Sequence, residues 1–226
     1  MTKHFLADIP LFNGLNSQQR RRMVGALRTR NFSAEQVIFN EGDLGDKLYI
    51  VREGLVRIYT DDLNKKETSV IMYGQPKSIF GELAILDGQP RSISAQAMEE
   101  TVVYTMSNRH FKHHLECIPQ LSMNLIQQMS YKMRKTTGHI HSLASKPVIA
   151  RLSILISQLA QEYGVEENNL TTVKFNLNQT QIANMIGATK ESTNRALMQL
   201  SQFKVLHQDE SRIHILDLKT LHSLGG

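Results

Sequence analysis

The sequence contains one cysteine, Cys117, and no tryptophan among its 226 residues. A single thiol excludes an intrachain disulfide and any cluster held by several thiolates of one chain, so we expect Cys117 to be a partly buried small residue. No apolar run approaches the roughly 20 residues that a bilayer-spanning helix needs. The first ten residues, MTKHFLADIP, are too polar for a signal peptide. These absences predict a cytoplasmic protein with no membrane partner.

Basic residues are in excess in only one part of the chain. The net charge is +5, yet Lys and Arg clearly outnumber Asp and Glu only in residues 109–144, by 5 to 1. The segments on either side are nearly balanced. The basic pI near 9.3 therefore does not by itself identify a nucleic-acid-binding protein, and that case must come from motifs.

Two kinds of hydrophobic pattern follow one another in the first half of the chain. Residues 8–32 predict short helical pieces, one of them beginning behind Asn16 or Ser17 as a cap. The triplet at 20–22 (Arg-Arg-Arg) is most simply a solvated helix face, with a protein contact surface as the alternative. Residues 36–106 are short alternating apolar segments separated by glycine-rich turns, which predicts an antiparallel sandwich or jelly roll.

The stretch FGELAILDGQPRSIS, residues 80–94, places a glutamate directly after a glycine and ends in an Arg-Ser pair. One interpretation is a surface turn in which Glu82 and Arg91 are solvated. The other is a site for a small ligand that carries an anion and hydroxyl groups. Arg91 and the backbone amides after Gly81 would then bind the anion, and Glu82 would accept from a sugar hydroxyl.

Residues 119–144 predict one long helix. Its apolar or small residues recur with gaps of three and four along a narrow seam, which favours a homodimer contact over a globular core. The seam consists of Leu125, Met129, Met133, Thr136, Ile140 and Leu143. Thr137 lies beside it, and hydroxyl groups in such a seam are costly unless they find partners. Pro147 breaks the helix, a second helix ends at Gly164, and a polar loop then leads into a strand-like segment.

Residues 176–206 predict two short helices separated by a turn at Gly187, which is helix-turn-helix spacing. Asn178 and Thr189 are the expected caps. The outward face of the second helix is either a solvated surface with an i,i+4 pair between Glu191 and Arg195, or a DNA-reading surface. We favour the second, in which Glu191 accepts from a cytosine amino group and Arg195 binds a guanine edge. Two short strands around residues 209–211 predict a β wing.

The order of these parts resembles the CRP/FNR family of bacterial transcription regulators, and within it the cyclic-AMP receptor protein branch. The resemblance covers almost the whole chain and is carried by EGDLGDKLYIVREGLVRIY, FGELAILDGQPRSISAQA and IGATKESTNRAL. It implies an α+β fold with three parts. These are an antiparallel β jelly-roll, cyclic-nucleotide-binding domain in residues 1–118, a dimerisation helix in 119–144 and a winged helix-turn-helix domain in 145–226.

The resemblance also implies the roles of individual residues. Arg91 and Ser92 would bind the cyclic phosphate of the nucleotide, Glu82 the ribose 2′-hydroxyl, and the two threonines the base, one of them from the partner subunit. The implied ligand-binding residues are Gly81, Glu82, Leu83, Arg91, Ser92, Thr136 and Thr137. The implied DNA-binding residues are Gln179, Thr180, Thr189, Lys190, Glu191, Asn194 and Arg195. Cyclic AMP is the expected ligand, ahead of cyclic GMP, and no metal is expected.

The mechanism that the resemblance implies is allosteric. Ligand would tighten the central helices through Ile140 and Leu143, and a hinge at 144–147 would place two recognition helices about 34 Å apart. The partners would be a second copy of the chain, a pseudo-palindromic DNA with TGA-containing half-sites, and RNA polymerase. Three departures stand out: Lys190 replaces an arginine, Gln179 replaces a basic residue, and Pro90 lies in a cassette loop one residue shorter.

Several alternative functions were considered, some with the same fold and some with a different role for the β domain. An iron-sulfur sensor conflicts with the single cysteine. A haem sensor would use histidines that we expect to be exposed helix residues; these are His110, His113, His114, His139 and His141. The same fold could respond to another ligand, or to none, or the β domain could regulate a partner enzyme. We expect no enzyme activity, because no metal-ligand spacing, nucleophile elbow or P-loop occurs in the sequence.

Overall fold

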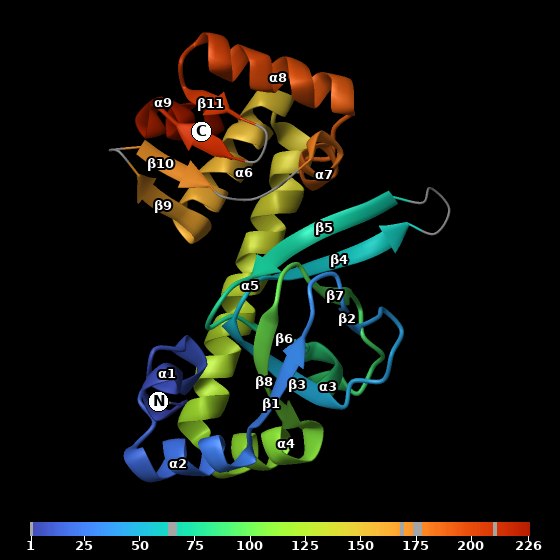
Figure 1. Cartoon of the computed structure of the whole chain (residues 1–226), viewed down its shortest axis with the longest axis vertical. Coiled ribbons are helices and arrows are strands. Elements are labelled where there is room, and N and C mark those ends of the chain that lie inside the picture. Colours follow the sequence, from blue (N-terminus) through green and yellow to red (C-terminus); the bar gives the residue numbers. More distant parts are fainter. Residues whose placement is uncertain (1, 63–66, 168–169, 174–177, 210–211) are drawn as a thin grey trace. The chain divides into compact units, whose positions relative to one another are not determined.

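The computed structural model describes residues 2–62, 67–167, 170–173, 178–209 and 212–226 (Figure 1). Three predicted segments are partly outside the described residues. These are the turn before residue 67, the polar segment after Gly164 and the turn of the wing, which lack residues 63–66, 168–169 with 174–177, and 210–211. The chain divides into two compact units, Met1–Arg134 and Lys135–Gly226. Each unit has its own core, and they are described in turn.

The first unit begins with helices α1 (Thr2–Ala7), η1 (Pro10–Phe12) and α2 (Ser17–Ala26). Asn16 is the N-cap of α2 and forms a capping box with Gln19, at 2.8 and 2.9 Å. The helical prediction is wrong for residues 28–32, which form strand β1 (Arg28–Phe32) and pair with β8 (Thr101–Ser107). Pairing with β8 determines that this segment is a strand, because its local sequence favours neither helix nor strand.

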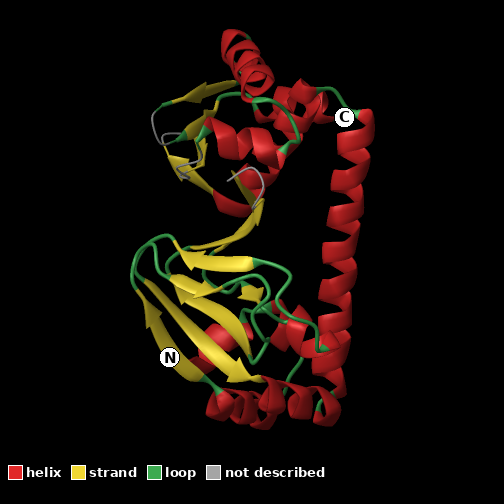
Figure 2. Ribbon diagram, turned by 90° about the vertical axis from the view of Figure 1, so that its right-hand side faces the viewer, coloured by secondary structure: helices red, strands yellow, loops and turns green. Residues whose placement is uncertain are grey.

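Two four-stranded antiparallel sheets form the β domain and confirm the predicted sandwich (Figure 2). Their orders are β1-β8-β3-β6 and β2-β7-β4-β5. The remaining strands are β2 (Val37–Phe39), β3 (Lys47–Glu53), β4 (Val56–Asp62), β5 (Glu67–Gly74), β6 (Ile79–Phe80) and β7 (Ser94–Ala97).

Strand β3 shows why the sandwich has two cores. Its side chains alternate with the period of two that a strand imposes. Leu48 and Ile50 join the core that packs against the helices, whereas Tyr49 and Val51 join the core between the sheets. Because β3 is buried on both faces, Tyr49 is held firmly at the side of the sheet where the cassette, residues 80–94, lies.

The helices of the first unit include α3 (Leu83–Asp87), α4 (Asn108–Cys117) and the beginning of α5 (Pro119–Ser145). Helices α2 and α4 cover the same end of the sandwich (Figure 1), and both contribute to the helix-facing core. Two expectations about α4 are wrong. His114 is buried, because it lies on the same face as Phe111, and Cys117 is exposed at the last turn.

The predicted seam of α5 is wrong in its N-terminal part. Leu125 is buried in the core of the first unit and Met129 packs against it. Asn124 explains why this part is fixed: its amide nitrogen donates to the carbonyls of Leu11 at 2.9 Å and Asn13 at 2.7 Å. The exposed stripe of α5 instead follows alternating steps of three and four through Met123, Ile126, Ser130, Met133, Thr137, Ile140 and Ala144.

The second unit contains α6 (Val148–Tyr163), α7 (Gln179–Met185), α8 (Lys190–Gln202) and α9 (Leu218–Gly225). Its sheet has the order β11-β12-β10-β9. The strands are β9 (Gly164–Glu167), β10 (Leu170–Val173), β11 (Leu206–Gln208) and β12 (Ile213–Ile215). The predicted loop after Gly164 is therefore partly a strand, since residues 164–167 pair with β10. Helix α9, which the sequence pattern did not predict, packs against α6.

Candidate functional site

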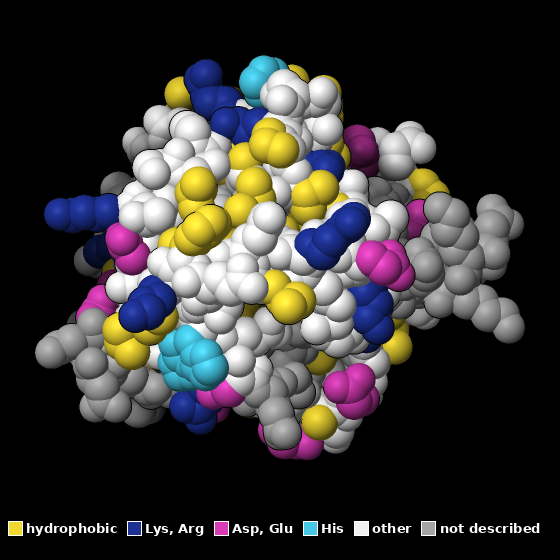
Figure 3. All heavy atoms as spheres, turned by 90° about the horizontal axis from the view of Figure 1, so that it is seen from above, with side chains coloured by type: hydrophobic (Ala, Val, Ile, Leu, Met, Phe, Trp, Pro, Cys, Tyr) yellow, Lys and Arg dark blue, Asp and Glu magenta, His cyan; other side chains and the backbone are white. Residues whose placement is uncertain are grey.

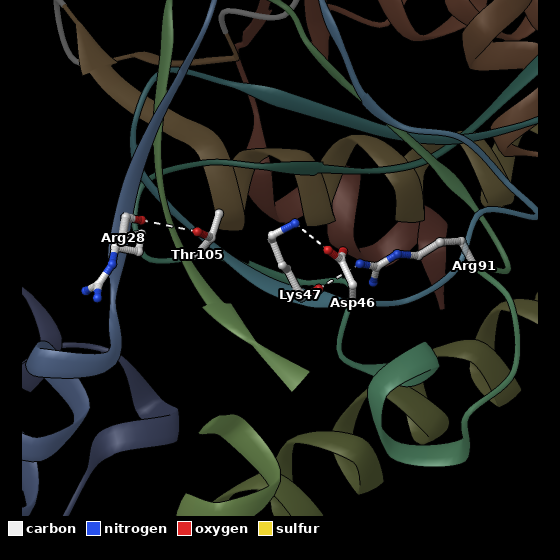
Figure 4. A network of polar contacts seen from close by, with 5 residues as sticks. All are labelled: Arg28, Asp46, Lys47, Arg91 and Thr105. Carbon is white, nitrogen blue, oxygen red and sulfur yellow. Dashed lines mark hydrogen bonds and ion pairs between the residues drawn. The ribbon is translucent and has the colours of Figure 1, made fainter. Parts of the chain in front are cut away.

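Arg91 is the centre of the cassette. Its side chain is buried, with 3% of the residue exposed. One terminal nitrogen, Nη1, donates to the carbonyl of Gly81 at 2.5 Å. The other, Nη2, donates to the carbonyl of Lys47 at 2.7 Å (Figure 4). Its Nε is buried and has no hydrogen-bond partner among the described residues. A buried donor without an acceptor is unfavourable, so Arg91 suits an anionic ligand that would supply one.

The surroundings of Arg91 are aromatic on one side and acidic on another. The guanidinium carbon lies 4.4 Å from the ring centre of Phe39 and 5.6 Å from that of Tyr49. Burial lowers the pKa of Arg91 below its ordinary value, and nearby Asp46, Asp43 and Glu82 act in the opposite direction. An arginine stays protonated in proteins, so the cassette holds a fixed positive charge.

Gly81 is required by the position of Arg91. Its φ is +77°, in the left-handed region that favours glycine. A Cβ atom at this position would lie 2.6 Å from Nη1 of Arg91 and 3.2 Å from Cδ2 of Tyr49. Any side chain here would therefore displace the guanidinium group.

Glu82 is buried as well, at 4% exposure, which excludes the solvated-turn interpretation of this stretch. Its Oε1 accepts a hydrogen bond from Nζ of Lys132, on α5, at 2.6 Å. Sequence reasoning missed Lys132. Lys132 lies one helical turn before Thr136, and this was the only feature of the sequence that could have indicated its role. It is 50 residues from Glu82 in the chain, and no sequence motif links residues so far apart.

The other predicted ligand-binding residues fall into two groups. Leu83 and Ser92 have exposed side chains and lie in the cassette itself. Leu83 begins α3, where the first backbone N–H groups have no intrahelical acceptor. Thr136 and Thr137 are exposed on the part of α5 that belongs to the second unit. Within one unit, the structure brings together five of the seven residues.

The helix-turn-helix is built from two capped helices. Asn178 caps α7 with a capping box to Gln181, and Thr189 caps α8 by accepting from the amide of Ser192 at 3.2 Å. Gly187, with φ +58°, forms the turn. Nη1 of Arg151, on α6, donates to the carbonyl of Gly187 at 3.1 Å, which fixes the turn to the rest of the unit.

Helix α8 presents the predicted reading residues on its exposed side. Lys190, Glu191 and Arg195 are exposed, and Asn194 is half-buried. Hydrogen bonds from the backbone N–H of Glu191 and from the hydroxyl of Thr189 lower the pKa of the Glu191 carboxyl. Glu191 is therefore an ionised acceptor at neutral pH. Nη2 of Arg195 donates to the hydroxyl of Ser192 at 3.1 Å.

The remaining predicted contacts lie beside this helix. Thr180 is exposed on α7, Gln179 is half-buried at the first turn of α7, and Thr189 is exposed at the start of α8. In the described parts of the chain, no helix is long and apolar enough to cross a bilayer. No cluster of three or more His, Cys, Asp or Glu suited to a metal ion occurs in those same parts.

Comparison with known proteins matches both units. Residues 29–116 match the cyclic nucleotide-binding domain, and residues 150–224 match the Crp-like helix-turn-helix domain. The CRP-like cAMP-activated global transcriptional regulator of Mycobacterium tuberculosis is 30% identical over 192 residues, which cover 85% of each chain. The chain belongs to the CRP/FNR family of transcription regulators.

Two further matches extend over most of the chain. The cyclic AMP receptor protein of Thermus thermophilus is 24% identical over 96% of each chain. The structure of FixK2 from Bradyrhizobium japonicum shares the fold, with a TM-score of 0.76 and 20% identity, and the match covers 88% of this chain and 98% of that one. This CRP/FNR member is therefore a DNA-binding transcription regulator with a cyclic-nucleotide-binding domain.

Proposed function

We propose that the protein is a dimeric transcription regulator whose DNA binding responds to a cyclic nucleotide, cyclic AMP in the first place, bound at the cassette. One observation carries the ligand class: a buried guanidinium with an unsatisfied Nε lies beside a buried carboxylate. An anion and a hydroxyl group on one small molecule would satisfy both, and a cyclic nucleotide carries the two on one ribose.

Each cassette residue has a role in this proposal. Arg91 and Ser92 bind the cyclic phosphate, and the first amides of α3, from Leu83 onward, add donors to it. Gly81 leaves the space that the guanidinium occupies. Glu82 accepts from the ribose 2′-hydroxyl while it keeps or exchanges its contact with Lys132.

The choice of cyclic AMP rests on the relatives and on the base contacts. The two curated relatives above are named for cyclic AMP. The hydroxyl groups of Thr136 and Thr137, one from each subunit of a dimer, are compatible with the amino group of adenine. Cyclic GMP is the weaker candidate, because neither of these relatives is named for it.

The dimer is supported by the exposed stripe on α5. Met133 and Ile140 are 73% and 61% exposed, and they follow a heptad-like spacing that extends from Met123 to Ala144. Such a stripe matches the contact surface of a two-stranded coiled coil. Thr137 lies on the stripe, so ligand and partner helix would meet at the same residue.

DNA recognition is assigned to α8. Glu191 and Arg195 read base edges in a major groove, with Lys190 and Asn194 beside them. Gln179, Thr180 and Thr189 lie where phosphate contacts are expected. Two such helices in a dimer require a pseudo-palindromic site. We retain residues 1–118, 119–144 and 145–226 as the functional domains, and propose a cytoplasmic, non-enzymatic activator that contacts RNA polymerase.

Calorimetric titration of the purified protein with cyclic AMP and with cyclic GMP tests the ligand. We expect cyclic AMP to bind more tightly. Arg91→Lys keeps the charge but loses the fork that suits phosphate, so it should weaken binding by at least about tenfold. Arg52→Lys, at a half-buried arginine paired with Glu53, is the matched control and should bind normally.

A mobility-shift assay on DNA selected from a random pool then tests the regulator. Cyclic AMP should increase the affinity of the protein for the selected site. No heat with either nucleotide from the folded protein would refute the ligand assignment. DNA binding that is strong and unaffected by cyclic nucleotides would leave a regulator of the same fold that is constitutive or responds to another ligand.

A further inference from the structure

Met198 is an exposed apolar residue on the reading side of α8. Met198 is 62% exposed, whereas the other apolar residues of this helix are buried. Thr193, Ala196, Leu197 and Leu200 form the buried face. Met198 therefore contributes little to the core of the unit, and the hydrophobic effect gives no reason for an apolar residue at this position.

The helical register places Met198 in line with the predicted base-reading residues. Glu191, Asn194, Arg195 and Met198 are spaced i, i+3, i+4 and i+7, which is one continuous stripe on a helix. At about 100° per residue, Met198 lies only about 20° around the axis from Glu191 and about 10 Å further along it. A recognition helix that lies along a groove can present residues with this same spacing to base edges.

The exposed surface around α8 mixes apolar and basic side chains. Figure 3 views the face on which α8 lies and shows hydrophobic side chains among Lys and Arg side chains. Phe203, just after the helix, is also exposed, at 71%. Phe203 lies about 120° around the axis from Glu191, so it is off the stripe and provides a comparison of similar chemistry.

The major groove displays one apolar group, the C5-methyl of thymine, and apolar side chains recognise it by contact. Methionine suits such a contact because its unbranched thioether adapts to irregular surfaces. We propose that Met198 contacts the C5-methyl group of a thymine and so selects thymine over cytosine at one position of each half-site. The inference rests on the proposed function, in which α8 reads DNA.

Thymine and uracil differ only by this methyl group, which allows a direct test. A DNA site is first selected with the native protein, and each thymine of a half-site is then replaced singly by deoxyuridine. One replacement should weaken binding of the native protein by about fourfold, the value expected for one buried methyl group. Met198→Ala should weaken binding to the thymine site by about fourfold or more and should bind thymine and deoxyuridine sites equally.

Two variants make the assignment specific. Met198→Leu keeps an apolar side chain and should retain the preference for thymine over deoxyuridine. Phe203→Ala removes an exposed apolar side chain off the stripe and should leave that preference unchanged. Circular dichroism of each variant checks that the helix-turn-helix remains folded.

The outcomes separate this inference from the proposed function. If the native protein selects a site and Met198→Ala keeps the full preference for thymine over deoxyuridine, the methyl contact is refuted while the DNA-reading role stands. If no single deoxyuridine weakens the native protein, the contact is refuted too. If the native protein binds no DNA with or without a cyclic nucleotide, the proposed function and this inference both fail.

Discussion

The ammonium group of Lys132 lies 2.6 Å from Oε1 of Glu82 and joins the long helix α5 to the cassette. The two partners differ in exposure: 41% of the lysine side chain is exposed, against 5% of the glutamate side chain. The lysine therefore reaches from the solvent side to a carboxylate that is almost fully buried. A buried carboxylate is unfavourable without a partner, so the ion pair with Lys132 offsets part of the cost of burying Glu82.

Removing the partner of Glu82 should destabilise the first unit. We expect Lys132→Met to lower the free energy of unfolding by about 1–2 kcal/mol, less than for a fully buried pair because the lysine is half-exposed. The double variant with Glu82→Gln should recover part of this loss, since the amide carries no charge. Urea denaturation followed by circular dichroism measures both. Equal stability of Lys132→Met and the native protein would contradict the role of the pair.

Two glycines of the cassette provide a matched pair. Gly81 and Gly88 have φ values of +77° and +73°, so alanine at either position should cost about 1–2 kcal/mol in backbone strain. Only the Cβ at Gly81 would contact Arg91, because the Cβ at Gly88 meets nothing within 4 Å. Gly81→Ala should therefore lose nucleotide binding at least about tenfold, whereas Gly88→Ala should retain it. Calorimetry that shows the same affinity for both variants would argue against this assignment.

The turn of the helix-turn-helix touches the end of α5. A Cβ on Gly187 would lie 2.8 Å from Cδ2 of Leu143. Gly187→Ala should cost about 1–2 kcal/mol from its positive φ and a further penalty from this contact. Leu143→Ala should relieve that second part, so the costs of the two substitutions should be less than additive. A double-mutant cycle in urea measures the coupling, and strict additivity would show that Leu143 moves away freely.

His114 should make the first unit sensitive to acid. Burial lowers its pKa below the ordinary 6.5, and the positive charges of His113, His110 and Arg22 act in the same direction. The unfolded chain therefore takes up a proton at a higher pH than the folded unit does. Stability is fully present above pH 6.5 and falls as the pH decreases through the lower, folded-state pKa.

The urea midpoint measured at about pH 7.5 and about pH 5.5 tests this sensitivity, because that interval spans the ordinary histidine range. His114→Gln should reduce the difference between the two midpoints. His139→Gln, at an exposed histidine of α5, should leave the difference unchanged. A native-sized difference in the His114 variant would assign the acid sensitivity to other groups.

The sequence predicted most elements where local signals were strong. Asn16, Asn178 and Thr189 cap their helices as expected, because a side chain that accepts from the third following amide is a local interaction. The strands of the sandwich follow alternating apolar residues. Strand β1 and the segment 164–167 were mispredicted, because each depends on pairing with a strand that lies elsewhere in the chain.

The sequence predicted only some of the residues of the candidate site. Glu82 and Arg91 were identified from residue type and spacing, but the sequence left open whether they were solvated or buried. Lys132 was not identified. The predicted seam of α5 shares Met133 and Ile140 with the exposed stripe, but it included Leu125, which is buried in the core of the first unit. Each error concerns which side of an element meets another element, and periodicity alone does not decide that.

By itself, the sequence determined the order of the parts, the capped helix-turn-helix and the chemistry of the cassette, because these depend on neighbouring residues and short spacings. Only the tertiary structure decided that Arg91 is buried with an unsatisfied Nε, that Lys132 pairs with Glu82, and that Leu125 belongs to a core. These features arise from contacts between residues far apart in the chain. Burial and the distance between charges set their energies, and the folded chain alone defines both quantities.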